Sequence, residues 1–148
     1  MHILVATDAQ YVVNDVTAAL SAPDVRFTIC SEGREVSRLV GNGDVDLAVL
    51  DLQIGSKGGM AVAMDLRLDH SAGRLPAVKV LMLLDRTADV HLAKRSAADT
   101  WLVKPTDPLT LKRAVHALMH PPAPVADAAE ADEPEAGETA EEETVAAG

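Results

Sequence analysis

Three side chains that can take part in metal or phosphate chemistry lie at the ends of short apolar segments. Asp8 follows the first segment, Asp51 ends the third, and Lys104 follows the fifth. Placing two carboxylates together where water is scarce costs free energy unless a cation lies beside them. Lys104 can supply one positive charge, and Mg²⁺, which prefers oxygen ligands and retains several waters, can supply more. The sequence therefore predicts a cation-compensated carboxylate site, if the fold brings these segment ends together.

The elements that must position these side chains alternate along residues 1–120. Apolar residues on consecutive positions predict five buried strands, at residues 2–6, 25–30, 45–50, 78–84 and 100–103. Apolar residues three and four positions apart predict five helices between and after them. The fourth helix is expected to run through Val90, Ala93 and Ala97, and the fifth to begin at Asp107-Pro108, a capping residue followed by proline.

This alternation predicts an α/β fold with a doubly wound, flavodoxin-like sheet. Five parallel strands with right-handed crossovers commonly take the order 2-1-3-4-5, which makes the first and third strands neighbours. In such sheets ligands bind beyond the carboxyl ends of the strands, where the winding reverses. Asp8 and Asp51 are therefore expected to lie at this point, with Lys104 on the same edge.

Composition divides the chain near residue 120. The 148 residues carry a formal net charge of −10, and residues 121–148 hold nine acids and no Lys or Arg. This segment has too few large apolar residues to offset the entropy of ordering a backbone, so we predict a single folded domain at residues 1–120 and a disordered acidic tail at 121–148. Neither part has the basic surplus of a nucleic-acid groove, so no direct nucleic-acid partner is expected.

Hydropathy and cysteine content restrict the location. No apolar run approaches the roughly 18 residues that span a bilayer, and the start of the chain lacks the pattern of a signal peptide. We therefore expect a cytoplasmic protein with no membrane partner. Cys30 is the single cysteine, so no internal disulfide forms and no zinc-type spacing exists.

Three sequence blocks carry a family resemblance. Residues 3–8 end in Asp8, residues 46–52 contain Asp51 with Gly59 eight positions beyond it, and residues 101–105 contain Lys104. Their order and spacing resemble the CheY-like receiver domain of bacterial two-component response regulators, over about residues 1–119. The resemblance implies signal transduction through a phosphorelay, with a histidine kinase or phosphotransfer protein as the phosphate-donating partner.

The same resemblance implies a role for each matched residue. Asp51 would be the phosphoacceptor, and Lys104 would pair with the phosphoryl oxygens. Asp8, Asp51 and the main-chain carbonyl of Gln53 would bind Mg²⁺. Trp101 stands where receivers place a switch aromatic that changes rotamer.

Two positions depart from the receiver pattern. Receivers usually carry two adjacent acids after the first strand, but the first of that pair is here Thr7, which weakens the expected Mg²⁺ affinity. Receivers also place a Ser or Thr at the end of the fourth strand, whereas residues 81–84 read Leu-Met-Leu-Leu. Without that hydroxyl, the phosphoryl group loses a contact that would differ between the two signalling states.

These observations predict an atypical single-domain response regulator that accepts phosphate on Asp51 and signals by protein contact with a downstream partner that the sequence does not name. It is not expected to be an enzyme beyond self-phosphorylation from a phosphodonor and slow autodephosphorylation. A homodimer is left open. The alternative is a pseudo-receiver that acts as a phosphorylation-independent interaction module.

Overall fold

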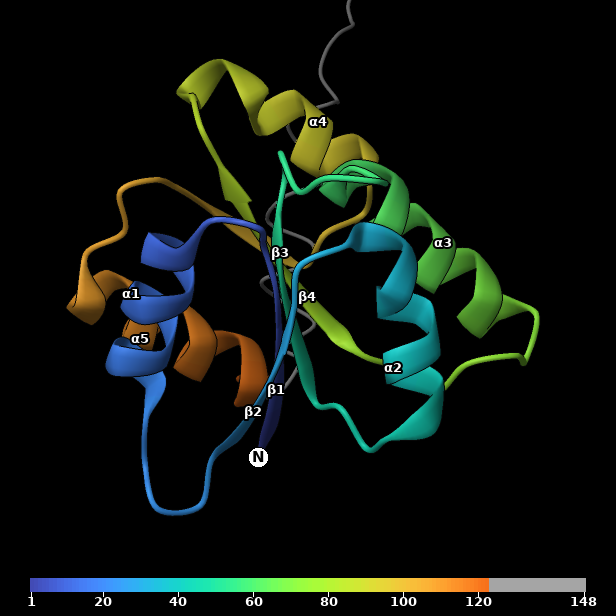
Figure 1. Cartoon of the computed structure of the whole chain (residues 1–148), viewed down its shortest axis with the longest axis horizontal. Helices are drawn as coiled ribbons and strands as arrows, with labels where there is room; N and C mark the ends of the chain where they lie inside the picture. The colour runs from blue at the N-terminus through green and yellow to red at the C-terminus, as the bar shows by residue number, and fades with distance from the viewer. Residues whose placement is uncertain (123–148) are drawn as a thin grey trace, which may run out of the picture.

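A five-stranded parallel sheet forms the centre of the protein. The computed structural model describes residues 1–122, and Figure 1 shows their arrangement. The strands lie in the order β2-β1-β3-β4-β5, which confirms the predicted topology. Their bounds are β1 His2–Ala6, β2 Arg26–Cys30, β3 Leu47–Asp51, β4 Lys79–Leu84 and β5 Thr100–Val103. Asp51 is thus the last residue of β3 and Lys104 directly follows β5.

Five helices cover the two faces of this sheet. Helices α1 and α5 pack together on one face, and α2, α3 and α4 lie on the other (Figure 1). Their bounds are α1 Gln10–Leu20, α2 Val36–Asn42, α3 Gly59–Ser71, α4 Val90–Arg95 and α5 Pro108–Met119, with single 3-10 turns at Gly33–Glu35 and Thr87–Asp89. As predicted, Asp107 caps α5, because its carboxylate accepts a hydrogen bond from the Thr110 amide at 2.9 Å.

Burial on both faces explains the uninterrupted apolar runs of the central strands. Every residue of β1 and β3 is buried. In β3, Ala48 and Leu50 pack into the core under α2, α3 and α4, whereas Leu47 and Val49 pack into the core under α1 and α5. A strand between two helical layers therefore needs apolar side chains on consecutive positions.

The fourth helix is shorter than its periodicity predicts. Helix α4 ends at Arg95, and Ala97 takes a left-handed conformation with φ of 61°. The buried Ser96 hydroxyl donates to the Ala93 carbonyl at 2.8 Å, and the Ala97 amide donates to the Lys94 carbonyl. The chain must reverse here to enter β5, so the apolar spacing continues through a turn that the periodicity does not distinguish from helix.

The acidic tail predicted for residues 121–148 lies outside the described residues except for Pro121 and Pro122. Its disorder and the domain boundary remain predictions. Within residues 1–122, no helix has both the length and the hydropathy needed to cross a membrane.

The two-layer core generates a stability prediction. Leu81 lies in the middle of β4 with no exposed surface, whereas Leu68 on α3 is 63% exposed. We expect Leu81→Ala to lower the free energy of unfolding by about 2–5 kcal/mol, because it removes buried methyl groups and leaves a cavity. The same truncation in Leu68→Ala should cost less than about 0.5 kcal/mol. Urea unfolding followed by circular dichroism measures both, and equal losses would contradict the assignment of the core.

Candidate functional site

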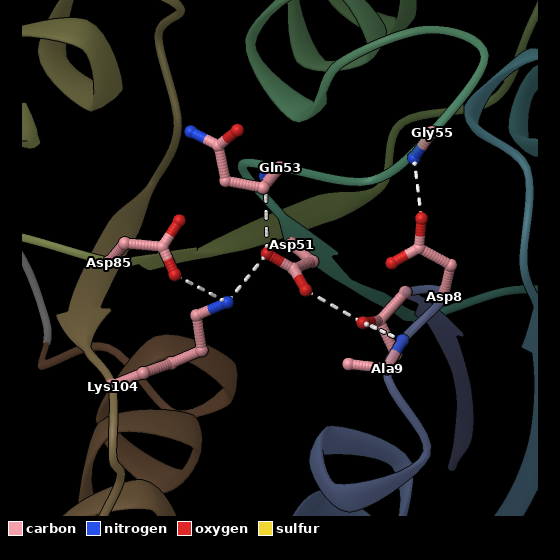
Figure 2. Close-up of polar contacts among 8 residues, drawn as sticks. Asp8, Ala9, Asp51, Gln53, Gly55, Asp85 and Lys104 are labelled. Atoms are coloured by element: carbon pink, nitrogen blue, oxygen red, sulfur yellow. Dashed lines mark hydrogen bonds and ion pairs between the residues drawn. The ribbon is translucent and has the colours of Figure 1, made fainter.

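A buried carboxylate, that of Asp51, lies at the carboxyl edge of the sheet. Its side chain is only 3% exposed. Its two oxygens accept three hydrogen bonds: Oδ2 from the Thr7 hydroxyl at 2.7 Å, and Oδ1 from the Gln53 amide at 3.1 Å and the Lys104 ammonium at 2.9 Å (Figure 2). Strands β1 and β3, the loop after β3 and the end of β5 therefore all contribute to this carboxylate. The predicted meeting of Asp51 and Lys104 occurs in the structure.

The ammonium of Lys104 lies between two carboxylates. Its Nζ atom is 2.9 Å from Asp51 Oδ1 and also 2.9 Å from Asp85 Oδ1, and its side chain is 9% exposed. Burial disfavours the charged ammonium, but hydrogen bonds and attraction from Asp51 and Asp85 outweigh it and raise the pKa of Lys104 above its ordinary value. Lys104 is therefore a protonated, fixed positive charge at neutral pH.

Thr7 is held firmly at the end of β1. Its amide donates to the Cys30 carbonyl on β2 at 2.9 Å, and its hydroxyl accepts a bond from the Ala9 amide at 3.1 Å while it donates to Asp51. The side chain is buried, and its hydroxyl is directed at the Asp51 carboxylate. A neutral donor thus occupies the position at which the receiver pattern places an acid.

Asp8 lies at the same edge but makes different contacts. It is exposed, and its Oδ2 accepts a hydrogen bond from the Gly55 amide at 3.1 Å. In Figure 2, Asp51 lies between Asp8 on one side and Lys104 on the other. Within residues 1–122, no hydrogen bond or ion pair joins Asp8 to Asp51 or Lys104. The strand ends lie close together, as expected. Of the three residues predicted to meet there, only Asp51 and Lys104 are in direct contact.

Asp85 is a member of the site that sequence reasoning missed. It directly follows β4, the strand that lies between β3 and β5. The rule that brought together the residues after β1, β3 and β5 applies equally to β4, so the position of Asp85 at a strand end was an available signal. The preceding Leu84 is fully buried and pairs with Val103, so β4 ends without a hydroxyl.

The available donor atoms are of the type that Mg²⁺ binds, but they carry one negative charge fewer than in the receiver pattern, because Thr7 replaces an acid. The predicted ligands, the carboxylates of Asp8 and Asp51 and a main-chain carbonyl, would all offer oxygen atoms, as a hard divalent ion requires. The described residues contain no group of three or more His, Cys, Asp or Glu side chains arranged to hold a metal. In the structure, the Thr7 hydroxyl and the Lys104 ammonium already engage the Asp51 oxygens.

The loop after β3 is closed tightly against Asp51. The Gly59 amide donates to the Leu52 carbonyl at 3.1 Å. A Cβ atom at position 59 would lie 2.6 Å from the Asp51 carbonyl oxygen and 3.0 Å from the Leu52 Cα. Only glycine therefore allows α3 to begin directly against the end of β3.

Trp101 lies on β5, an edge strand of the sheet. It is half-buried against the core under α2, α3 and α4, and the Lys94 ammonium lies 5.9 Å from its ring centroid. Core packing and the nearby ammonium therefore both favour an aromatic side chain at this position. Its predicted rotamer switch stays a prediction.

A doubly wound sheet with a buried Asp–Lys pair at its carboxyl edge is the arrangement expected of a two-component receiver domain. The family model described as the response regulator receiver domain matches residues 3–116, and the chain belongs to this family. It is thus a receiver domain of a response regulator, as the sequence blocks predicted.

Individual relatives agree with this assignment. An uncharacterized response regulatory protein of Mycobacterium tuberculosis is 36% identical over 101 residues, which cover 68% of this chain and 73% of the relative. The fold is similar to that of the chemotaxis response regulator CheY4 of Vibrio cholerae, with a TM-score of 0.68, 22% identity, and coverage of 79% of this chain and 97% of that one.

The fold is also similar to the receiver domain of a sensor histidine kinase from Pseudomonas aeruginosa, which was solved with a magnesium ion coordinated in its active-site cleft. The TM-score is 0.65, the identity is 19%, and the match covers 80% of this chain and 96% of that domain. At such identities, the two structural matches concern the fold alone.

The hydroxyl of Thr7 generates a second prediction. Thr7→Val keeps the shape of the side chain but removes the donor to a buried carboxylate, so we expect a loss of about 1–3 kcal/mol in the free energy of unfolding. Thr7→Ser keeps the hydroxyl and should retain most of that stability. Urea unfolding at constant pH measures both variants. A valine variant as stable as the wild type would contradict the role given to this hydrogen bond.

Proposed function

We propose that this receiver domain accepts a phosphoryl group on Asp51 from the phosphohistidine of a histidine kinase or phosphotransfer protein. The observation that carries the proposal is the Asp51 carboxylate with the Lys104 ammonium 2.9 Å away at the carboxyl edge of the sheet. Receiver domains of this family interact with such donors in two-component signalling. The family assignment and the local geometry therefore support the same residue as acceptor.

The transfer requires little of the protein besides position and charge. An oxygen of the Asp51 carboxylate attacks phosphorus and forms a P–O bond, while the P–N bond breaks and its electron pair stays on the histidine ring. The product is an acyl phosphate on Asp51. The Lys104 ammonium offsets the negative charge on the transferred oxygens, and it needs no large movement because it is already within contact distance.

The residues that would hold Mg²⁺ are Asp8, Asp51 and the main-chain carbonyl of Gln53. The bound ion would supply additional neutralisation of the phosphoryl oxygens. Support comes from the all-oxygen donor set and from the related receiver domain that coordinates magnesium in its cleft. Because Thr7 contributes a neutral hydroxyl where an acid would contribute charge, we propose that the affinity for the ion is low.

Output is proposed to proceed by protein contact and with weak coupling to phosphorylation. Strand β4 ends in the buried Leu84, so no hydroxyl from this strand can follow the phosphoryl group. A ligand shifts a conformational equilibrium only through contacts that differ between the two states. Trp101 on β5 is the aromatic whose rotamer would report such a shift.

A second candidate function rests on the same departures. With Thr7 and Leu84 in the site, and with three donors already on the Asp51 oxygens, the fold can present one surface to partners whether or not phosphate arrives. This is the pseudo-receiver function. Its distinguishing feature is the lack of phosphotransfer to Asp51.

Mass spectrometry of the intact protein separates the two functions. After incubation with acetyl phosphate and Mg²⁺, we expect the wild type to gain the mass of one PO₃ group and Asp51→Asn to gain none, because the amide cannot form an acyl phosphate. Circular dichroism of both proteins controls for folding. An unmodified wild type with several phosphodonors would favour the pseudo-receiver and contradict the proposal.

The low affinity for Mg²⁺ is tested by restoring an acid. Thr7→Asp adds a carboxylate beside Asp51, so we expect Mg²⁺ to bind about tenfold more tightly, a change of about 1.4 kcal/mol. Isothermal titration calorimetry measures the dissociation constant. Asn14→Asp, which adds the same charge on the exposed face of α1, serves as the matched control. If the two variants bind the ion equally, Thr7 does not limit the site.

A further inference from the structure

The Asp85 carboxylate forms an ion pair with Lys104, the cation on which the proposed phosphotransfer depends. We propose that the Asp85 carboxylate competes with the phosphoryl group for Lys104 and thereby restrains phosphorylation of Asp51. The inference rests on the proposed function, and it assigns regulation of that site to a residue outside the three matched sequence blocks. Asp85 acts here through Lys104 and is a positioning residue.

The position of Asp85 allows it to compete with a phosphoryl group for Lys104. Figure 2 shows the Lys104 ammonium between the two carboxylates. Its Nζ atom is 2.9 Å from an oxygen of each. The ammonium donates a hydrogen bond to Asp51 Oδ1 and forms an ion pair with Asp85 Oδ1. A phosphoryl group on Asp51 would present several acceptor oxygens to the same ammonium, so the Asp85 bond must be given up for Lys104 to turn fully toward phosphate.

The local charge balance points in the same direction. One ammonium faces two carboxylates, and phosphorylation adds further negative charge beside them. The neighbouring cation, Arg86, forms its ion pair with the buried Asp89 at 2.8 Å and attracts Asp85 only at longer range, without an ion pair to it. Within residues 1–122, the ion pair of Asp85 is with Lys104. Asp85 thus opposes the phosphoryl group both by occupying Lys104 and by repulsion.

Exposure makes this opposition reversible. The Asp85 side chain is 39% exposed, whereas those of Asp51 and Lys104 are almost fully buried. Asp85 can therefore turn into water at small cost, while the other two groups remain in place. A pair with one exposed partner is weak, so we expect a restraint on phosphorylation and not a block.

The test removes the charge of Asp85 and keeps its shape. With acetyl phosphate and Mg²⁺, Asp85→Asn is expected to be phosphorylated about three- to tenfold faster than the wild type, the range of a weak charge-assisted pair. Beryllium fluoride, which mimics a phosphoryl group without covalent transfer, should bind this variant more tightly by a similar factor. Intact mass and ¹⁹F NMR give the two measurements.

Three further variants control for charge and folding. Asp15→Asn removes the same charge from the exposed face of α1 and should leave both quantities unchanged. Asp85→Glu keeps the carboxylate and should stay within about twofold of the wild type, because the ion pair can re-form. Asp85→Ala provides a second charge-free variant. A gain in rate is informative because damage to the fold would lower it.

The outcomes separate this inference from the proposed function. Equal rates and affinities for the wild type and both charge-free variants, with Asp51 labelled in all, would overturn the role of Asp85 and leave the proposed function intact. Labelling of the charge-free variants alone would support opposition by Asp85, as a block stronger than the expected restraint, and would contradict phosphotransfer to the wild-type protein. Labelling of none would overturn both.

Discussion

A carboxylate that is buried at the meeting point of three strands must be compensated by the protein around it. Asp51 meets this requirement with one ammonium, one hydroxyl and one amide, each delivered by a different part of the chain. The order of the strands matters for this reason: β1 and β4 flank β3, and β5 follows β4, so the residues after these strands reach the same place. The sheet thus brings Thr7 and Lys104 within hydrogen-bond distance of Asp51.

Much of the architecture follows from local sequence pattern. Strands buried on both faces are apolar on consecutive residues, so their number, their parallel arrangement and the pairing of Asp51 with Lys104 were predictable. What could not be predicted depends on side-chain rotamers and loop paths. Spacing does not reveal that Asp8 turns to the Gly55 amide, or that the Thr7 hydroxyl donates to Asp51. Periodicity likewise extends past Arg95, where the chain turns.

The departures from the receiver pattern share one electrostatic consequence. Receivers gather acids at this edge, and their mutual repulsion is relieved by a bound cation. Here Thr7 removes one acid from beside Asp51, while Asp85 adds one on the far side of Lys104. Compared with the receiver pattern, the number of acids is similar, but one negative charge lies beside Lys104 instead of beside the proposed Mg²⁺ ligands. The site therefore relies more on its own lysine for compensation.

The close approach of Gly59 to the backbone of Asp51 makes the mutational tolerance of the domain uneven. Any side chain at this position would collide with main-chain atoms that have no freedom to retreat, since they belong to a central strand. The partly exposed side chain at position 85, by contrast, can be exchanged without rebuilding the scaffold, whereas the buried hydroxyl at position 7 can be exchanged only at a cost in stability. Amino-acid variation can thus retune the polar edge of this sheet one group at a time, while the frame that carries it admits no comparable change.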